Sequence, residues 1–256
     1  MQNAIDRMTN EIVSVMNGSV YGIWLYGSVV LNDFKPGWSD IDLIALTDGP
    51  LTDAQAETLL TLRQKLQANA PGNPYYRSFE GIVADVNEYR DRTFTKLVYW
   101  GTSGQRITSR CTPDVFSEFE LAKYGICVYG DRAWILPAPP YEELVRAVKA
   151  QCEAIRTCAV QTDERLYSCG WLLDIARCIY TLRNRDIIGK TQAGMWALSE
   201  HLFCDEEPLR TALKIRKDPI LYRDRPEVKQ WLKALGPVVQ AYADVLEREL
   251  FAITSV

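Results

Sequence analysis

The sequence contains a single histidine, His201, among its 256 residues. This scarcity speaks against a catalytic triad centred on imidazole and against a metal site built from several histidines. The seven cysteines are scattered and odd in number, and no two have the C-x-x-C spacing of a zinc site or a redox motif. We therefore expect neither a disulfide framework nor structural zinc, but reduced thiols, as in a cytoplasmic protein.

Long apolar runs are missing as well. No window approaches the roughly 20 apolar residues that cross a bilayer, and the N-terminal residues do not follow the pattern of a signal peptide. No tract rich in lysine and arginine interleaves with aromatic residues, so an extended nucleic-acid surface is not expected. These absences predict a cytoplasmic protein without a membrane or nucleic-acid partner.

Charge is unevenly distributed along the chain. From Tyr141 onward there are 17 basic and 17 acidic residues, whereas the part before it has 12 basic and 16 acidic residues. The whole net charge of −4 therefore belongs to the first part of the chain. An acidic site there would favour a cationic small molecule as ligand.

Two domains are expected, separated by a proline-rich linker. Residues 137–140 read Pro-Ala-Pro-Pro, which cannot continue a helix or a strand. We predict an α+β domain over residues 1–136 and an all-helical domain over residues 141–256. Residues 94–112 have the composition of a substrate loop. The predicted strands are 21–26, 40–46, 79–86 and 126–129, and the predicted helices are 4–16, 52–69, 115–124, 141–158, 163–185, 190–203, 208–216 and 226–251.

One segment, residues 26–42, carries most of the functional information. It reads Tyr-Gly-Ser-Val-Val-Leu-Asn-Asp-Phe-Lys-Pro-Gly-Trp-Ser-Asp-Ile-Asp. The turn at Gly27 and Ser28 offers backbone N–H groups and a hydroxyl to a phosphate. Asp40 and Asp42 flank one apolar residue, so in a strand both carboxylates point to the same side. Such carboxylates repel each other unless a hard cation lies between them, typically Mg²⁺ with nucleotide phosphates. The segment predicts a nucleotidyl-transfer site.

A third carboxylate is expected from the strand predicted over residues 79–86. Phosphoryl transfer of this kind uses two or three carboxylates on Mg²⁺ and a group that deprotonates the attacking hydroxyl. Glu80 opens that strand and would lie beside Asp40 and Asp42 in an adjacent ladder. We therefore assign Glu80 as third metal ligand and catalytic base. Asp85 is the competing candidate, although strand alternation places it on the opposite face from Glu80.

With these residues identified, the first part of the chain resembles the polymerase-β-type nucleotidyltransferases. More narrowly, it is similar to the bacterial streptomycin/spectinomycin adenylyltransferases, and the second part fits that family's helical-domain signature. The resemblance implies an N-terminal polymerase-β-like nucleotidyltransferase domain, a mixed sheet with helices, followed by an all-α helical bundle. The matching segments are 25–28, 35–36 and 39–43 in the first part, and 176–180, Ile187, Lys190, Ala193 and 196–197 in the second.

The resemblance also implies residue roles. In that family, the arginine and the lysine that match Arg177 and Lys190 hold the ATP phosphates, and the catalytic carboxylate matches Glu80. Fixed cations around a triphosphate stabilise the charge that moves to the leaving pyrophosphate. The nucleotide-binding residues that we expect are Gly27, Ser28, Ser39, Arg177 and Lys190.

The acceptor half of the site departs from the family's pattern. Where its streptomycin users carry a tryptophan, this sequence has Thr102 and Ser103, and two polar or acidic positions near the signature helix are Tyr167 and Gly170. An amine-rich acceptor calls for carboxylates and a flat apolar wall. The candidate acceptor contacts are Trp100, Asp163, Glu164, Trp171 and Asp174.

We therefore predict an enzyme, a Mg²⁺-dependent aminoglycoside adenylyltransferase acting as a monomer. It would transfer AMP from ATP to a hydroxyl of a cationic aminocyclitol antibiotic, spectinomycin or streptomycin, and so confer resistance. Two alternatives stay open: adenylylation of a protein partner, as in toxin–antitoxin or regulatory nucleotidyltransferases, and a different small acceptor such as a lincosamide. A fold that binds nucleotide without catalysis is a third alternative, which the intact acidic pair speaks against.

Overall fold

The computed structural model describes residues 1–101 and 104–254, and the chain forms two compact units. Unit 1 comprises Met1–Val30 and Asp40–Ala138, and unit 2 comprises Leu31–Ser39 and Pro139–Val256. The sequence suggested one division near the proline-rich linker. The structure differs at Leu31–Ser39, which lies between two strands of unit 1 in sequence but belongs to unit 2.

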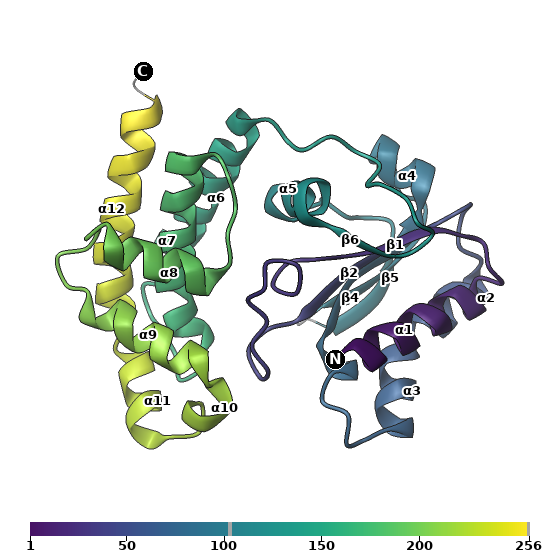
Figure 1. Ribbon diagram of the computed structural model, residues 1–256, viewed down its shortest axis with the longest axis horizontal. Coiled ribbons are helices and arrows are strands. Elements are labelled where there is room, and N and C mark those ends of the chain that lie inside the picture. The colour runs from purple at the N-terminus through teal and green to yellow at the C-terminus, as the bar shows by residue number, and fades with distance from the viewer. Residues whose placement is uncertain (102–103, 255–256) are drawn as a thin grey trace. The chain divides into compact units, whose positions relative to one another are not determined.

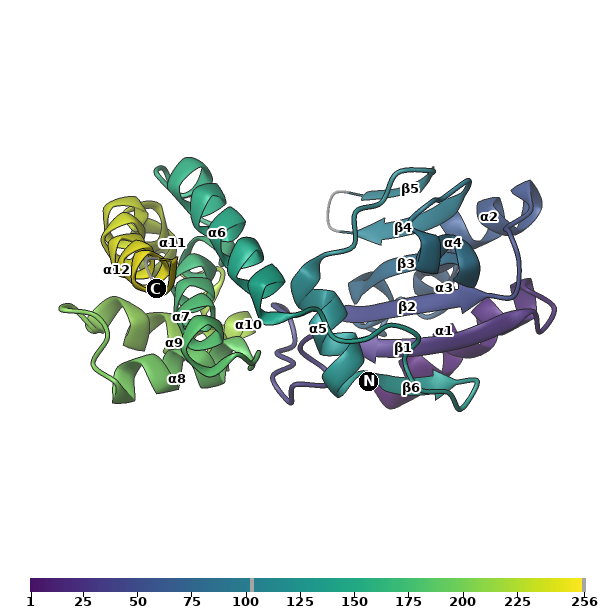
Figure 2. The ribbon, with the colours of Figure 1, turned by 90° about the horizontal axis from the view of Figure 1, so that it is seen from above.

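Unit 1 is built on a six-stranded mixed sheet with the strand order β5-β4-β3-β2-β1-β6 (Figure 2). The β2 and β3 strands are parallel, and every other neighbouring pair is antiparallel. The β1–β2 connection has no regular secondary structure and carries the segment singled out by its sequence. The strands are β1 (Val20–Tyr26), β2 (Ile41–Thr47), β3 (Phe79–Asp85), β4 (Leu97–Gly101), β5 (Gly104–Thr108) and β6 (Ile126–Tyr129).

Helices cover both faces of this sheet (Figure 1). Residues of α4 and α5 pack with Trp24, Ile44 and Leu46 in one apolar cluster, and α1, α2 and α3 lie on the other side. The helix predicted over residues 52–69 is in fact two helices, which meet at Thr61. The helices of unit 1 are α1 (Gln2–Val15), α2 (Asp53–Leu60), α3 (Leu62–Asn69), the 3₁₀ turn η1 (Tyr76–Ser78), α4 (Val86–Asp91) and α5 (Val115–Tyr124).

The region predicted as a substrate loop, residues 94–112, instead contains β4 and β5. The side chains of Leu97, Val98 and Trp100 are buried, so this stretch contributes to the sheet and its core. Its aromatic composition reflects packing, which composition alone does not distinguish from ligand binding. Thr102 and Ser103, where the sequence departs from the family's pattern, lie outside the described residues.

Unit 2 consists of helices around α7, whose residues from Ser168 to Ala176 are all buried. The α7 helix packs against α6, α8, α9 and α12. The helix predicted over residues 226–251 is divided in two, because Gly236 and Pro237 start a new helix there. The helices are α6 (Tyr141–Cys158), α7 (Tyr167–Asn184), α8 (Lys190–Ser199), α9 (Glu207–Lys217), α10 (Pro219–Tyr222), α11 (Pro226–Lys233) and α12 (Gly236–Thr254).

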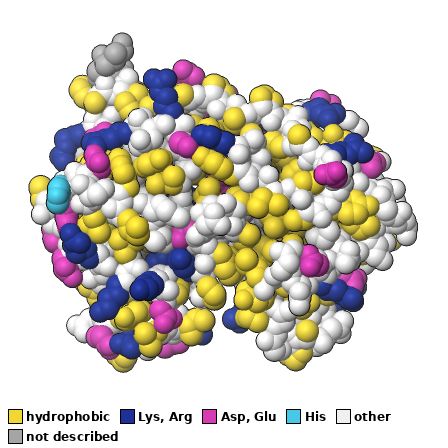
Figure 3. Space-filling view, viewed as in Figure 1, with side chains coloured by type: hydrophobic (Ala, Val, Ile, Leu, Met, Phe, Trp, Pro, Cys, Tyr) yellow, Lys and Arg dark blue, Asp and Glu magenta, His cyan; other side chains and the backbone are white. Residues whose placement is uncertain are grey.

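Two further observations concern the helices and the surface of the described residues. Within residues 1–101 and 104–254, no helix combines the length and the apolar character needed to cross a membrane. On the face shown in Figure 3, lysine and arginine side chains are interspersed with aspartate and glutamate.

Candidate active site

Three acidic residues at the beginnings of the central strands β2 and β3 form the centre of the site. We call Asp40, Asp42 and Glu80 the acidic row. In the sheet register, Asp42 of β2 pairs with Glu80 of the parallel strand β3 and with Tyr26 of the antiparallel strand β1. Paired backbone positions in neighbouring strands lie about 5 Å apart. Asp40 lies just before β2 begins. The sheet therefore brings Glu80 beside Asp42, as the sequence predicted.

The turn at Gly27 and Ser28 rests directly on the carboxylate of Asp42. Gly27 has a φ of +67°, and a Cβ atom there would lie 2.0 Å from Oδ2 of Asp42, so the contact requires glycine. The backbone N–H of Ser28 donates to Asp42. The Ser28 hydroxyl donates to the carbonyl oxygen of Asp40 at 3.3 Å. The two parts of the sequence motif thus form one connected structure.

Negative charge accumulates around the acidic row. Burial raises the pKa of Asp42 well above its usual value, and Glu120, Asp40 and Glu80 raise it further by charge repulsion. Arg63 of α3 interacts with Glu80 and Asp40 electrostatically. Its guanidinium nevertheless donates to neutral oxygens, the Phe79 carbonyl at 2.6 Å and the Gln105 side chain at 3.2 Å. Asp42 therefore lies where carboxylate repulsion dominates.

These residues suit a hard divalent cation that arrives with its own ligands. Among the described residues, no three Asp, Glu, His or Cys side chains converge closely enough to form a metal site by themselves. Mg²⁺ in nucleotide sites needs only one or two carboxylates, because phosphate oxygens and waters complete its coordination. The repulsion at Asp42, together with the oxygen-only donor set, fits that mode of binding.

Glu80 is held by a residue of the neighbouring strand. The hydroxyl of Tyr99 donates to Oε1 of Glu80 at 3.3 Å, and the guanidinium of Arg106 lies 4.1 Å from the centre of the Tyr99 ring. Asp85, the competing third carboxylate, lies at the far end of β3. It is buried and accepts the backbone N–H groups of Asn87 and Glu88, so it caps α4. Of the two candidates, Glu80 is the one beside Asp42.

A fourth carboxylate near the acidic row was not predicted. Glu120 of α5 is only 4% exposed, and its charge raises the pKa of both Asp42 and Tyr26. In the sequence it is one acid in a short helix, between Phe119 and Leu121. Nothing in that pattern indicates that α5 packs on β1 with this side chain inward.

The two cations expected to bind phosphate form a cluster in unit 2. Nζ of Lys190, at the start of α8, lies 3.0 Å from Oδ1 of Asp174, and the guanidinium of Arg177 lies 3.3 Å from the same oxygen. Asp174 is buried, whereas about a quarter of each cationic side chain is accessible. Asp174 was predicted to contact the acceptor. Here it serves as the shared counter-ion of Arg177 and Lys190, which we call the cation cluster.

Two tryptophans predicted to contact the acceptor have different surroundings. Trp100 is completely buried, and its indole N–H donates to the Leu59 carbonyl at 3.1 Å. It is therefore a core residue, and its assignment as an acceptor contact is corrected. Trp171 is 8% exposed and meets the ring of Tyr167 edge to face at 4.6 Å, with Tyr167 itself exposed. This pair offers an aromatic surface at the start of α7.

The remaining predicted site residues make local contacts. A hydrogen bond from the side chain of Arg165 lowers the pKa of Asp163. Glu164 lies 3.2 Å from Nζ of Lys233. Ser39 is buried, and its hydroxyl accepts the backbone N–H of Lys35 at 3.0 Å, so it closes the loop before Asp40.

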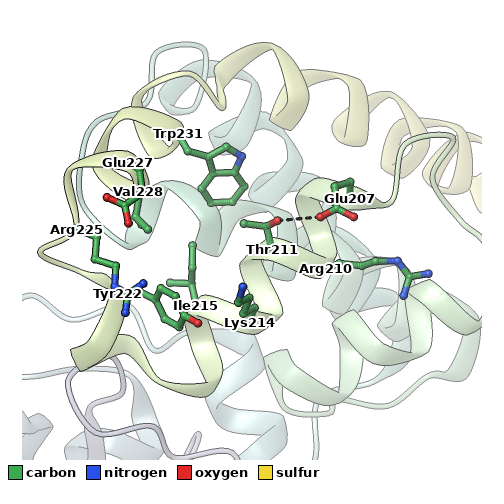
Figure 4. Close-up of a pocket in the computed structure, with 10 residues that line it drawn as sticks. All are labelled: Glu207, Arg210, Thr211, Lys214, Ile215, Tyr222, Arg225, Glu227, Val228 and Trp231. Atoms are coloured by element: carbon green, nitrogen blue, oxygen red, sulfur yellow. Dashed lines mark hydrogen bonds between the residues drawn. The ribbon is translucent and has the colours of Figure 1, made fainter.

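Unit 2 also has a cavity of about 390 Å³ among α9, α10 and α11 (Figure 4). None of the predicted site residues lines it. Its basic side chains have partners: Lys214 and Arg225 lie over the ring of Tyr222, and Arg210 pairs with Glu206 at 2.6 Å. We assign it no ligand.

Comparison with known proteins gives consistent results for both units. Residues 7–84 match the nucleotidyltransferase domain family, and residues 135–236 match the family described as aminoglycoside adenylyltransferase, C-terminal domain. A spectinomycin 9-adenylyltransferase from Campylobacter jejuni is 24% identical over 211 residues, which are 77% of this chain and 79% of that protein.

A solved structure has the same fold. It is the spectinomycin adenyltransferase from Enterococcus faecialis, crystallised with ATP and spectinomycin, with a TM-score of 0.62 and 18% sequence identity. The similarity covers 96% of this chain and 99% of that one. At this identity the match shows a shared architecture that extends over both units.

Proposed function

We propose that this chain is an aminoglycoside adenylyltransferase that transfers AMP from ATP to a hydroxyl of spectinomycin, a proposal that the family matches of both units and the curated relative support. The observation that carries the proposal is the turn at Gly27 and Ser28, bonded to Asp42, which pairs in the sheet with Glu80. Two relatives named for spectinomycin support the choice of acceptor.

Nucleotide binding is the first step. The N–H groups and hydroxyl of the Gly27–Ser28 turn would contact the triphosphate, and Asp40 and Asp42 would hold Mg²⁺. When bound, that ion neutralises phosphate charge and makes the α-phosphorus a better electrophile. Arg177 and Lys190 would bind the β- and γ-phosphates, exchanging part of their contact with Asp174 for phosphate oxygens.

Transfer requires a base for the acceptor hydroxyl. Glu80 would take that proton while the hydroxyl oxygen attacks the α-phosphorus in line. The bond from the α-phosphorus to the bridging oxygen breaks, and pyrophosphate leaves with its charge stabilised by Arg177 and Lys190. The hydrogen bond from Tyr99 orients Glu80 for this task.

Two features of the protein favour a cationic acceptor. The acidic row and Glu120 concentrate negative charge in unit 1, which attracts amines. Asp163 and Glu164, which precede the aromatic pair of Tyr167 and Trp171, supply the carboxylates, and the pair supplies the apolar surface that an aminocyclitol needs. We propose these residues, without Trp100 and Asp174, as acceptor contacts.

An acceptor panel tests the proposal. Purified protein is incubated with Mg²⁺, ATP labelled at the α-phosphate and one acceptor: spectinomycin, streptomycin or a lincosamide. The products are identified by mass spectrometry. We expect one adenylyl group on spectinomycin, with release of pyrophosphate, and much slower transfer by Glu80→Gln. Label on a lincosamide or on a co-purifying protein would instead establish one of the alternative acceptors. Absence of transfer to every acceptor would refute the proposal.

A further inference from the structure

The loop Leu31–Ser39 is attached to the helices of unit 2 by a buried ion pair. Asp33 and Arg216 are 1% and 2% exposed, and Nη2 of Arg216 lies 2.7 Å from Oδ2 of Asp33. The same guanidinium nitrogen donates to the Asp33 carbonyl at 3.2 Å. On the other side of the loop, Arg216 lies over the ring of Trp38 at 5.2 Å. One arginine of α9 thus holds both halves of the loop.

Asp33 also caps α8, the helix that begins with Lys190. The residue before this helix is Gly189, which has no side chain to cap it. Oδ2 of Asp33 accepts the backbone N–H of Thr191 at 3.0 Å, which is the bond that a capping side chain normally makes. A Cβ atom on Gly189 would lie 2.6 Å from Cβ of Asp33, so the close approach needs glycine. A residue 158 positions away therefore supplies the cap.

The capping carboxylate decides how α8 can bind phosphate. A helix N-terminus attracts anions, and here the anion is already provided by the protein. Burial alone would raise the pKa of Asp33, but Arg216 and the Thr191 bonds outweigh it and hold the pKa below its usual value, so the carboxylate is charged. A triphosphate would therefore contact α8 through the side chain of Lys190 and not through the backbone N–H groups at the end of the helix.

The ion pair is better suited to fixing a position than to adding stability. Burying two charges is costly, and replacing such a pair by apolar residues is often neutral or stabilising. Here, Oδ1 of Asp33 and Nη1 of Arg216 are buried without a hydrogen bond. The ammonium of Lys35 lies 3.6 Å from Oδ1. The arrangement gives the loop one defined register on the helices of unit 2.

We propose that Asp33 is a positioning residue for nucleotide binding, which rests on the function proposed above. The loop continues on one side into Ser28 and on the other into Asp40. Asp33 follows Ser28 by five positions, and a chain of that length spans at most about 18 Å. Asp33 thus fixes the loop that follows the phosphate-binding turn, and it caps the helix that begins with Lys190.

Hydrogen exchange in the full-length protein tests the attachment independently of activity. The variants are Asp33→Ala and the isosteric Asp33→Asn, with Arg156→Gln as matched control. Arg156 joins α6 to α12 through Asp244 at 2.5 Å and Glu247 at 2.7 Å, in the same unit but outside the proposed site. We expect faster exchange in peptides covering residues 31–39 and 189–193 in Asp33→Ala, and unchanged exchange there in Arg156→Gln. Unchanged exchange in Asp33→Ala would overturn the proposal.

Nucleotide affinity tests the positioning role. In Asp33→Ala, the Kd for a non-hydrolysable ATP analogue with Mg²⁺ should rise about tenfold or more, the loss expected for a charge-assisted contact. Asp33→Asn, which can still accept the Thr191 bond, should lie between this variant and the wild type. Arg156→Gln should lower the Tm with an unchanged Kd. An unchanged Kd in Asp33→Ala would overturn the inference even if the loop is released.

Failure of the inference and failure of the proposed function give different results. If wild-type protein binds the analogue but adenylylates no acceptor, the proposed function fails, while the exchange and affinity data still decide the role of Asp33. If spectinomycin is adenylylated by wild type and by Asp33→Ala with the same KM for ATP, the proposed function stands and the inference fails.

Discussion

The acidic row of unit 1 and the cation cluster of unit 2 handle charge in opposite ways. In the acidic row, Asp42 lies among other carboxylates, and its pKa is raised by burial and by their repulsion. In the cation cluster, Arg177 and Lys190 share the buried carboxylate of Asp174. The first arrangement brings like charges together, whereas the second brings opposite charges together within the protein.

On the basis of this difference we propose distinct tasks for the two regions. Carboxylates that repel one another gain from a bound divalent ion and can take up a proton, as chemistry at phosphorus requires. Cations held by a carboxylate are already placed and lose little side-chain entropy when phosphate arrives. We therefore expect substitutions in the acidic row to reduce turnover, and substitutions in the cation cluster to reduce nucleotide affinity.

The largest effect is expected at Glu80. Glu80→Gln keeps the size of the side chain but cannot take the acceptor's proton, so kcat should fall roughly 10²- to 10⁴-fold. The KM for ATP should change little, because the substituted amide adds no charge near the phosphates. Single-turnover measurements with spectinomycin check this, with Asp48→Asn as control, an exposed acid just after β2. Equal rates for Glu80→Gln and wild type would remove Glu80 as the base.

The next largest effect is expected for the two cations. Arg177→Ala and Lys190→Ala should each weaken binding of MgATP by about 10- to 100-fold, the value of one hydrogen bond to a charged group. Isothermal titration with a non-hydrolysable analogue measures this directly. Lys229→Ala, which removes a half-buried lysine whose ammonium lies 3.8 Å from Asp224, is the control and should leave the affinity unchanged. If both cluster variants bind nucleotide normally, the assigned division of tasks is wrong.

Asp174→Ala sharpens the comparison, because it separates two roles of one residue. As counter-ion of the cation cluster, its loss should weaken MgATP binding by about tenfold while the KM for spectinomycin stays within about twofold. If Asp174 is an acceptor contact instead, as the sequence predicted, its loss should raise the KM for spectinomycin and leave MgATP binding nearly unchanged. Steady-state kinetics with each substrate varied in turn distinguishes the two results.

For Asp42→Asn we predict the effect on stability, and we expect the variant to be more stable than wild type. Because the folded pKa of Asp42 lies well above its usual 3.8, the folded protein binds this proton more tightly than the unfolded chain does. Its contribution to stability is therefore fully present at low pH and is lost as the pH rises through the folded pKa. The variant avoids this loss, so its Tm at pH 8 should be higher than that of wild type.

The size and pH dependence of that gain can be checked by thermal unfolding without ligands. Each kcal/mol corresponds to about 2–4 °C in a chain of this size. The difference should shrink towards zero as the pH approaches about 4, near the unfolded pKa of an aspartate. A Tm below that of wild type at pH 8 would show that Asp42 is not under repulsion.

The smallest effect on kinetics is expected at Trp100. Trp100→Phe removes the indole bond to Leu59 and part of the packing beneath α2, so the protein should lose about 1–3 kcal/mol of stability. Both KM values should stay unchanged, because this side chain is completely buried. A specific rise in the KM for spectinomycin would restore Trp100 as an acceptor contact.

The sequence predicted the features that depend on short-range spacing. Asp42 and the turn at Gly27 are local patterns whose geometry follows from strand alternation and turn chemistry, whereas Asp40, predicted to open the strand, lies just before it. The pairing of Glu80 with Asp42 followed from the order of the strands. Asp85 could be placed away from it for the same reason, since five positions along a strand change the face and the end of the sheet.

Features that depend on distant packing were missed. A sequence does not distinguish the buried Trp100 from the aromatic pair of Tyr167 and Trp171. Whether an aromatic side chain is buried depends on which elements pack over it in the folded protein. The roles of Glu120 and Asp33 depend on contacts with elements far along the chain, α5 on β1 and the loop on α8. Asp174 was predicted to contact the acceptor, but its partners are defined only once α7 and α8 are packed together.

The most direct test of the central claim is metal binding by the acidic row. Mn²⁺ can stand in for Mg²⁺, and its binding to wild type and to Asp42→Asn is measured by electron paramagnetic resonance with and without a non-hydrolysable ATP analogue. We predict tight binding to wild type only when the analogue is present, and at least about tenfold weaker binding to the variant under the same conditions. Equal Mn²⁺ affinity of the two proteins with the analogue bound would contradict the account.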